Sequence, residues 1–201
     1  MNIEYVLLAI IVILAILMPI VFFREHNRNV RKMKEISEGL EKMLKPKDKI
    51  YTLLGTSLGF RALYRLDRDG IKRAEAVLLL LPRHSLVYYP ISKITSRYDK
   101  LILKVEYVEN LDLKPSTIER KKKFCKEGEK IRYAGKNFTM CGKDAGKLFN
   151  MLGFLRNQKD FLRISYENKI LFVEFKSSSI SVLNDLDSIL REAAKFVISK
   201  P

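Results

Sequence analysis

Residues 5–23 read YVLLAIIVILAILMPIVFF, nineteen consecutive residues without a charged side chain. As an α-helix, with a rise of about 1.5 Å per residue, this segment would extend about 28 Å, which matches the hydrocarbon core of a bilayer. A core helix of a soluble protein keeps a polar stripe, whereas this segment is apolar on every side. The sequence therefore predicts a transmembrane anchor over residues 1–24.

The apolar segment is expected to stay attached as a signal anchor. A secretory signal peptide has a basic region before a shorter apolar stretch, and small residues at its cleavage site. Here the only charged side chain before the segment is Glu4, and the segment ends in the bulky Phe22 and Phe23. We therefore expect a single-pass protein of the cell membrane.

Basic residues follow the apolar segment closely, and none precedes it. They are Arg24, Arg28, Arg31, Lys32 and Lys34. Because basic residues next to a span remain in the cytoplasm, we expect the N-terminus outside and the C-terminal domain in the cytoplasm. The same five residues form a candidate membrane-surface site, since anionic lipid headgroups attract lysine and arginine.

The whole chain is basic, with 38 Lys and Arg against 23 Asp and Glu and a net charge of +15. Such a surface favours anionic partners, which include lipid headgroups, nucleic acid and acidic proteins, but it also suits simple solubility. The densest basic stretch beyond the anchor is a candidate basic loop. Its members are Lys121, Lys122, Lys123 and Lys126.

Two cysteines, Cys125 and Cys141, are too few for a disulfide framework and lack metal-ligand spacing, so we expect both to be thiols. A single Gln among many Lys, Glu and Ile residues favours a thermophilic source.

Residues 25–46 are predicted to form a juxtamembrane helical stalk that ends before Pro46. Its apolar residues follow the 3-4-3 spacing of a coiled-coil seam, at Met33, Ile36, Leu40 and Met43. Two arrangements satisfy this spacing. The seam can join two copies as a homodimer through residues 30–44, or it can pack on the chain's own domain.

Residues 47–157 are predicted to form an antiparallel β domain closed by a helix. Short runs rich in Val, Ile, Leu and Tyr alternate with turn residues there, which is typical of strands. We expect strands at residues 50–54, 60–66, 74–81, 85–89, 100–108, 131–133 and 138–140, and a helix at 143–156. Ala76–Leu81 is apolar on both faces, which predicts a strand covered on both sides. The charged residues 109–130 are expected to form a long exposed loop.

Residues 158–201 are predicted to add a β-hairpin and an amphipathic C-terminal helix. The hairpin strands would be residues 161–166 and 170–175. The helix shows one apolar stripe. Its members are Leu183, Leu186, Leu190, Ala193 and Val197. The expected fold class is α+β.

The order of elements from Ile50 to Arg156 resembles pleckstrin-homology-like domains. The features that carry it are a meander, a hydrophobic strand, the pattern LVYYPISKI at residues 86–94, and a last hairpin that runs directly into a helix. The resemblance implies a half-open antiparallel barrel closed at one end by the helix. The segment after Gln158 has no place in that family's pattern, and no binding residue carries over.

The sequence contains no GxSxG, HExxH or phosphate-binding loop, and no cofactor is expected. We therefore expect an interaction or scaffold module that binds a protein partner or anionic lipid. An enzyme would have to use His84 or the Asp67–Asp69 turn, in a concave pocket with a partner group. A nucleic-acid-binding protein would have to place tyrosines and lysines on one exposed face.

Overall fold

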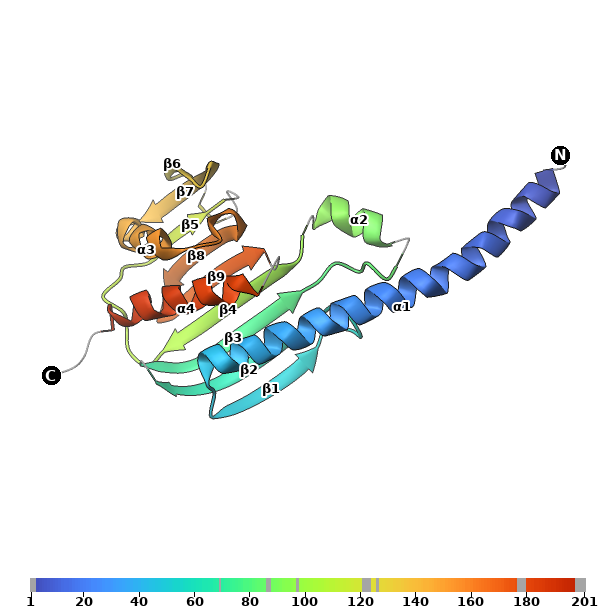
Figure 1. Ribbon diagram of the computed structural model, residues 1–201. Helices are drawn as coiled ribbons and strands as arrows, with labels where there is room; N and C mark the ends of the chain where they lie inside the picture. Colours follow the sequence, from blue (N-terminus) through green and yellow to red (C-terminus); the bar gives the residue numbers. More distant parts are fainter. Residues whose placement is uncertain are drawn as a thin grey trace.

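The computed structural model describes residues 3–68, 70–85, 88–96, 98–120, 124–125, 127–176 and 180–197. The helices are α1 (Ile3–Leu44), α2 (Tyr88–Thr95), α3 (Ala145–Met151) and α4 (Ser181–Ala194), with 3-10 turns at Leu152–Phe154 and Gln158–Asp160. The strands are β1 (Asp48–Leu53), β2 (Gly59–Arg68), β3 (Ile71–Leu79), β4 (Lys100–Tyr107), β5 (Ser116–Glu119), β6 (Glu129–Tyr133), β7 (Lys136–Gly142), β8 (Phe161–Glu167) and β9 (Ile170–Lys176). The predicted α+β class is confirmed (Figure 1).

All nine strands belong to one antiparallel sheet, in the order β1-β2-β3-β4-β9-β8-β5-β7-β6. The C-terminal hairpin β8–β9 therefore lies in the middle of the sheet, where β9 pairs with β4 and β8 pairs with β5. This hairpin connects strands β1–β4 on one side of the sheet to strands β5, β7 and β6 on the other side. The expected division into 47–157 and 158–201 stays a prediction about folding units.

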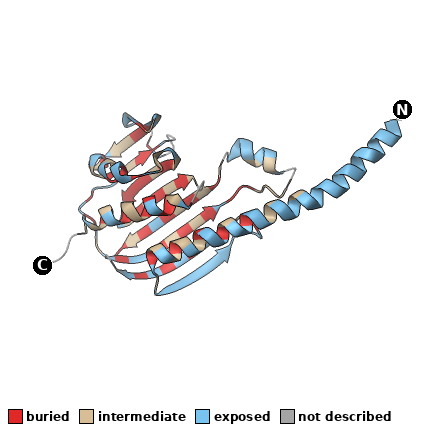
Figure 2. Ribbon diagram, viewed as in Figure 1, coloured by how far each residue is buried: buried red, intermediate tan, exposed pale blue. Residues whose placement is uncertain are grey.

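Helix α1 is continuous from the apolar segment into the domain. Residues 3–20 are exposed, whereas the C-terminal half packs against the sheet (Figure 2). The buried residues of that half include the seam residues Met33, Ile36 and Leu40, and Met43 packs partly against the core. The stalk thus packs on its own domain. Dimerisation through residues 30–44 stays a prediction, and it would have to use the other faces of the helix.

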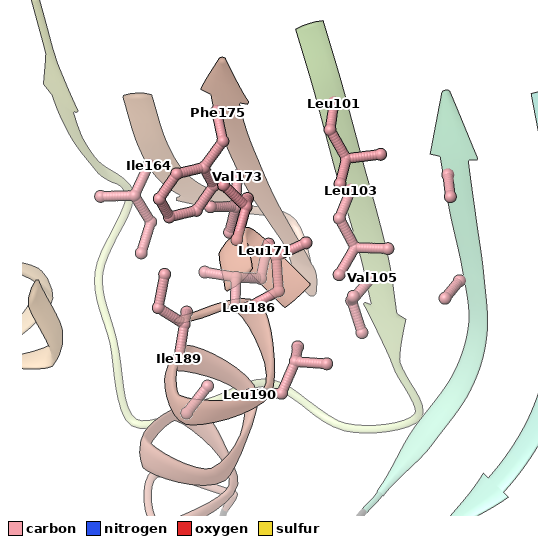
Figure 3. Packing of buried hydrophobic residues seen from close by; sticks show 14 of the residues in the cluster. Leu101, Leu103, Val105, Ile164, Leu171, Val173, Phe175, Leu186, Ile189 and Leu190 are labelled. Atoms are coloured by element: carbon pink, nitrogen blue, oxygen red, sulfur yellow. The ribbon is translucent and has the colours of Figure 1, made fainter. Parts of the chain in front are cut away.

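Helix α4 lies beside α1 on the same face of the sheet. Its Leu186, Ile189 and Leu190 pack on the inward side chains of β4 and β9, of which Leu103 and Val173 are fully buried (Figure 3). The predicted amphipathic stripe is confirmed for Leu183, Leu186, Leu190 and Ala193, whereas Val197 lies beyond the end of α4 and forms an isolated β-bridge with Leu111. Where the two helices meet, α1 carries Gly39, and a Cβ there would lie 2.2 Å from Leu183 Cδ1.

Over β2, β3, β4 and β9 the opposite face of the sheet is partly open to solvent and carries cross-strand ion pairs, whereas at β5 and β8 the outward Glu119 and Ser165 are buried. Arg61 Nε lies 2.7 Å from Glu75 Oε1, and Lys100 Nζ lies 2.7 Å from Glu174 Oε1. Leu79 on this face is 40% exposed. The prediction that Ala76–Leu81 is covered on both sides is therefore wrong, because charged neighbours keep the outer face in water.

Two elements differ from the sequence-based expectation. The strand predicted at residues 85–89 is wrong at Tyr88 and Tyr89, which begin α2, and its Leu86 and Val87 lie outside the described residues. Pro90 accounts for this difference, since proline cannot donate to a strand ladder but fits the first turn of a helix. Strand β5 lies inside the predicted loop 109–130 and pairs with β7 and β8.

Strand β5 ends at Glu119, a carboxylate that is only 2% exposed. Its Oε1 accepts hydrogen bonds from the backbone N–H groups of Phe124, at 2.7 Å, and Cys125, at 2.6 Å.

Cys125 forms a disulfide with Cys141 of β7, so the expectation of two free thiols is wrong. The spacing of two cysteines in the sequence could not show that β7 folds back beside this loop. The basic loop of Lys121, Lys122, Lys123 and Lys126 lies outside the described residues.

Candidate functional site

A cavity of about 680 Å³, which we call the α2 pocket, lies at the end of the sheet from which α1 leaves the domain. This volume falls within the roughly 300–1,000 Å³ of typical small-molecule sites. The residues that line the pocket are Leu54, Leu58, Leu79, Leu80, Leu81, Pro82, His84, Ser85, Tyr88, Ser92, Ser96, Tyr98 and Lys100. The first six form an apolar wall, and the remainder form a largely polar side.

A larger hollow of about 840 Å³ lies at the other end of the sheet, around the turn between β2 and β3. Several charged side chains of its lining are already paired: Lys47 contacts Asp67, and both Lys72 and Arg73 contact Glu106. Asp67 is exposed, and Asp69 lies outside the described residues. We therefore place the candidate site at the α2 pocket.

Beside the α2 pocket, Asp99 joins α1 to the loops that flank α2. Its Oδ2 accepts a hydrogen bond from Lys32 Nζ of α1 at 2.8 Å, and both carboxylate oxygens lie 3.0 Å from Arg83 Nη2. Its Oδ1 also accepts from the backbone N–H of Leu81 at 2.9 Å. Burial raises the pKa of Asp99, but these hydrogen bonds outweigh burial and hold the pKa below its ordinary value.

Asn29 of α1 completes this junction. Its Nδ2 donates to the carbonyl oxygens of Ser57, at 2.9 Å, and Leu81, at 3.0 Å, and its Oδ1 accepts from Arg83 Nη1 at 3.3 Å. Asn29 is 1% exposed, so these bonds satisfy a polar group that would be costly to bury alone. We call the group of Asn29, Lys32, Arg83 and Asp99 the α1 clamp.

His84 lies between the α2 pocket and the apolar segment. Its ring is 5.5 Å from that of Phe22 and 6.5 Å from that of His26, and its Nδ1 is 3.0 Å from Ser57 Oγ. A catalytic His84 would need a concave pocket and a partner group, and the α2 pocket and the Ser57 hydroxyl could supply them. Ser57, however, is 0% exposed, so its hydroxyl cannot meet a substrate, and the pair is a structural contact.

The two sides of α2 differ in what they contact. Tyr88, Ser92 and Ser96, spaced four residues apart, line the pocket. Ile91 and Ile94 point elsewhere and are 54% and 76% exposed. The helix therefore turns its hydroxyl side chains toward the pocket and leaves two isoleucines in solvent.

The predicted membrane-surface residues divide by position along α1. Arg24 and Arg28 follow Phe23 by about 1.5 and 7.5 Å along the helix axis, within the depth of one headgroup layer. Arg31 and Lys34 lie farther along, by about 12 and 16 Å. The side chains of Arg24, Arg28 and Lys34 are 83%, 69% and 75% exposed. Lys32 belongs instead to the α1 clamp.

The tyrosines do not share one exposed face. Tyr107 and Tyr133 are buried, whereas Tyr88 is 66% exposed. A stacking surface for nucleic acid, as the sequence allowed, is therefore not formed by these residues. Among the residues that the structure describes, no group of three His, Cys, Asp or Glu side chains could hold a metal ion.

The sequence predicted Lys32 only as a membrane-surface residue, and it did not predict the other three members of the α1 clamp. Asn29 precedes Met33 by four positions, so it occupies a core position of the same helix face, and this polar interruption was a usable signal. Arg83 and Asp99 lie in loops, where no periodicity points to a contact with α1.

No protein-family model matches this chain, and no curated protein matches it. The resemblance to pleckstrin-homology-like domains therefore stays a prediction.

Proposed function

We propose that this chain is a single-pass membrane protein whose domain is a non-enzymatic interaction module held at the bilayer surface. The observation that supports it is the continuity of α1. Its exposed apolar half is long enough to cross a membrane, and its other half is part of the domain core. The α1 clamp fixes the domain to the helix a few residues after the apolar segment, so an uncleaved anchor would also set the position of the domain.

We infer that the domain faces the cytoplasm. The basic residues after the apolar segment support this orientation. The Cys125–Cys141 disulfide is typical of oxidising compartments, but intracellular proteins of hyperthermophiles also contain such bonds. A thermophilic source, which the composition favours, accommodates both observations.

The ligand that the charges support best is anionic lipid. Arg24 and Arg28 lie within the headgroup layer if α1 spans the bilayer, and each basic residue near such a surface contributes about 1 kcal/mol. Their pairing with Glu25 is loose, at 3.9 and 3.5 Å, and leaves both arginines largely exposed.

A protein partner is the second candidate, and strand β1 supports it. All six residues of this edge strand are exposed, and Ile50 and Leu53 are 59% and 65% exposed. An exposed apolar edge strand can receive a strand from another protein.

The test uses the full-length protein in vesicles that contain equal amounts of phosphatidylcholine and phosphatidylglycerol. After mild detergent extraction, the retained lipid is measured by mass spectrometry. We expect enrichment of phosphatidylglycerol, and loss of that enrichment in the double variant Arg24→Gln/Arg28→Gln. The control variant Arg61→Gln/Arg65→Gln changes two exposed arginines of β2 and should retain it.

Equal retention of both lipids by the wild type would contradict the lipid proposal. Orientation is tested separately. Digestion of the domain by a protease added outside intact cells would contradict the cytoplasmic placement.

A further inference from the structure

We propose that the α2 pocket holds one acyl chain of a phospholipid taken from the adjoining leaflet, with α2 lying in the headgroup layer as its outer wall. This inference rests on the proposed membrane anchoring. It adds a binding site for the hydrocarbon part of a lipid, separate from the attraction of arginines to headgroups.

The lining of the pocket suits hydrocarbon. Three chain segments supply its apolar wall: the β1–β2 loop with Leu54 and Leu58, the end of β3 with Leu79, and the segment after it. Leu79 is 40% exposed and Leu54 and Leu58 are partly exposed, so these three side chains are accessible to a ligand, whereas Leu80 and Leu81 are buried behind them. Cavities of this volume with mostly apolar walls and a few polar groups are typical ligand sites.

The described lining residues offer little free positive charge that could bind the phosphate of a lipid headgroup. Within the described part of the chain, Lys100 is the one lysine or arginine that lines the pocket, and its Nζ lies 2.7 Å from Glu174 Oε1. Its charge is therefore already balanced. A chain without charge fits this lining better than a phosphate does.

The pocket lies next to the level at which the apolar segment of α1 ends. His84 belongs to its lining, and the His84 ring contacts that of Phe22, two positions before Arg24. If α1 spans the bilayer, His84 lies at the boundary between acyl chains and headgroups. An acyl chain of the same leaflet can therefore enter the pocket without crossing bulk water.

Helix α2 has the features of a helix that lies in a membrane interface. Figure 1 shows α2 at the end of the domain from which α1 protrudes. Ile91 and Ile94 are exposed on one side, Tyr88 is 66% exposed, and Lys93 is the basic residue of the last turn. Tyrosine concentrates at membrane interfaces, and interfacial helices combine an apolar side with basic residues. Its Ser92 faces the pocket, so the same helix can contact the membrane and enclose a chain.

The experiment uses the full-length protein in nanodiscs that contain a phospholipid with a photoreactive diazirine in one acyl chain. After illumination, adducts are located by peptide mass spectrometry. We expect adducts on the apolar segment of α1, and a second set on the peptides that carry Leu54, Leu58 and Leu79.

A matched pair of variants tests whether the second set comes from the pocket. Leu79→Trp fills the pocket and should abolish the second set, while the adducts on α1 remain. Leu63→Trp is the control, because Leu63 lies on the same sheet face and is 39% exposed, but lines the hollow around the β2–β3 turn and not the α2 pocket. Ser92→Trp fills the pocket from the side of α2. It is used as the pocket-filling variant if Leu79→Trp melts at a lower temperature than Leu63→Trp.

Adducts confined to α1, or a second set that persists in both pocket-filling variants, would overturn the pocket proposal and leave the anchoring intact. Absence of adducts on α1 as well would mean that the anchoring proposal itself has failed.

Discussion

At the scale of single residues, the junction between α1 and the sheet depends on Asp99. Its side chain is 4% exposed, and those of its partners Lys32 and Arg83 are 25% and 19% exposed. A carboxylate in such a place is costly to bury, and the two cations compensate for that cost. Removing the carboxylate would leave two poorly hydrated positive charges side by side.

We therefore expect Asp99→Asn to lower the free energy of unfolding by about 3 kcal/mol. The measurement is denaturant or thermal unfolding of the full-length protein in detergent. Asp112→Asn is the control, because Asp112 is 76% exposed and its ion pair with Lys147 at 3.3 Å should contribute little. An equal effect of both substitutions would contradict the role of the clamp.

The pH dependence gives a second readout of the same variant. Because the folded-state pKa of Asp99 lies below its ordinary value, its stabilisation is complete above about pH 4 and is lost as the pH falls through the folded-state pKa. The difference in stability between the wild type and Asp99→Asn should therefore shrink on acidification. A difference that stayed constant down to low pH would contradict this assignment.

At this scale the sequence allows predictions that depend on position along one helix, but it does not reveal contacts between residues that are far apart in the chain. Arg24 and Arg28 could be proposed as membrane-surface residues from the sequence, because that proposal depends only on their distance from the apolar segment along one helix. Asp99 and Lys32 are 67 residues apart. Their contact depends on how the β3–β4 connection folds back onto α1, which no local pattern contains.

At the scale of elements, the packing of α1 on α4 depends on a small residue. Gly39 is unfavourable within a helix by about 1 kcal/mol relative to alanine, so its place needs a packing reason. The reason is the close approach of Leu183, whose side chain is buried.

We expect Gly39→Leu to destabilise the protein by about 1–3 kcal/mol, because the added side chain has to displace Leu183 from the core. Gly146→Leu in α3 is the control, since a Cβ at Gly146 meets nothing within 4 Å. Thermal melting of both variants tests the expectation, and equal melting temperatures would refute it.

The elements that were predicted well are those with a long or regular pattern. The stripe of α4 and the hairpins β1–β2, β6–β7 and β8–β9 could be derived from periodicity and turn residues. Strand β5 has only four residues and lies among charged neighbours in the sequence. Its Glu119 is buried because backbone N–H groups donate hydrogen bonds to the carboxylate, and the sequence does not reveal these contacts. Helix α2 is not evident from the sequence, because the mostly apolar residues 85–89 favour a strand that ends just before Pro90.

At the scale of the whole molecule, the stalk is part of the core and not a separable spacer. Met33, Ile36, Leu40 and Leu44 are each at most 8% exposed. Burial of one such side chain contributes about 1.5–3 kcal/mol, so together they match the total stability of an ordinary domain.

We therefore expect residues 45–201 not to fold when produced alone. Residues 25–201, which keep the α1 clamp and these four side chains, should fold and unfold cooperatively. Circular dichroism and thermal melting of the two fragments distinguish the cases. Cooperative unfolding of residues 45–201 would show that the core does not need α1.

The class of the fold could be predicted at this scale, but the order of the strands could not. Most strands pair with their sequence neighbours, and hairpin signals find such pairs. The pairing of β4 with β9, which joins the two halves of the sheet, spans more than sixty residues. Leu103 of β4 and Val173 of β9 are paired and fully buried there beneath α4, and no local sequence pattern specifies that contact.

An unbroken α1 also has a mechanical meaning. Leu44 is 21 residues beyond Phe23, so the far end of the helix stands about 30 Å from the hydrocarbon boundary if α1 spans the bilayer upright. Without a hinge between span and domain, a load applied to the distal strands is transmitted as a torque on the membrane-embedded segment. If α1 spans the bilayer, the domain and the span would therefore tilt together.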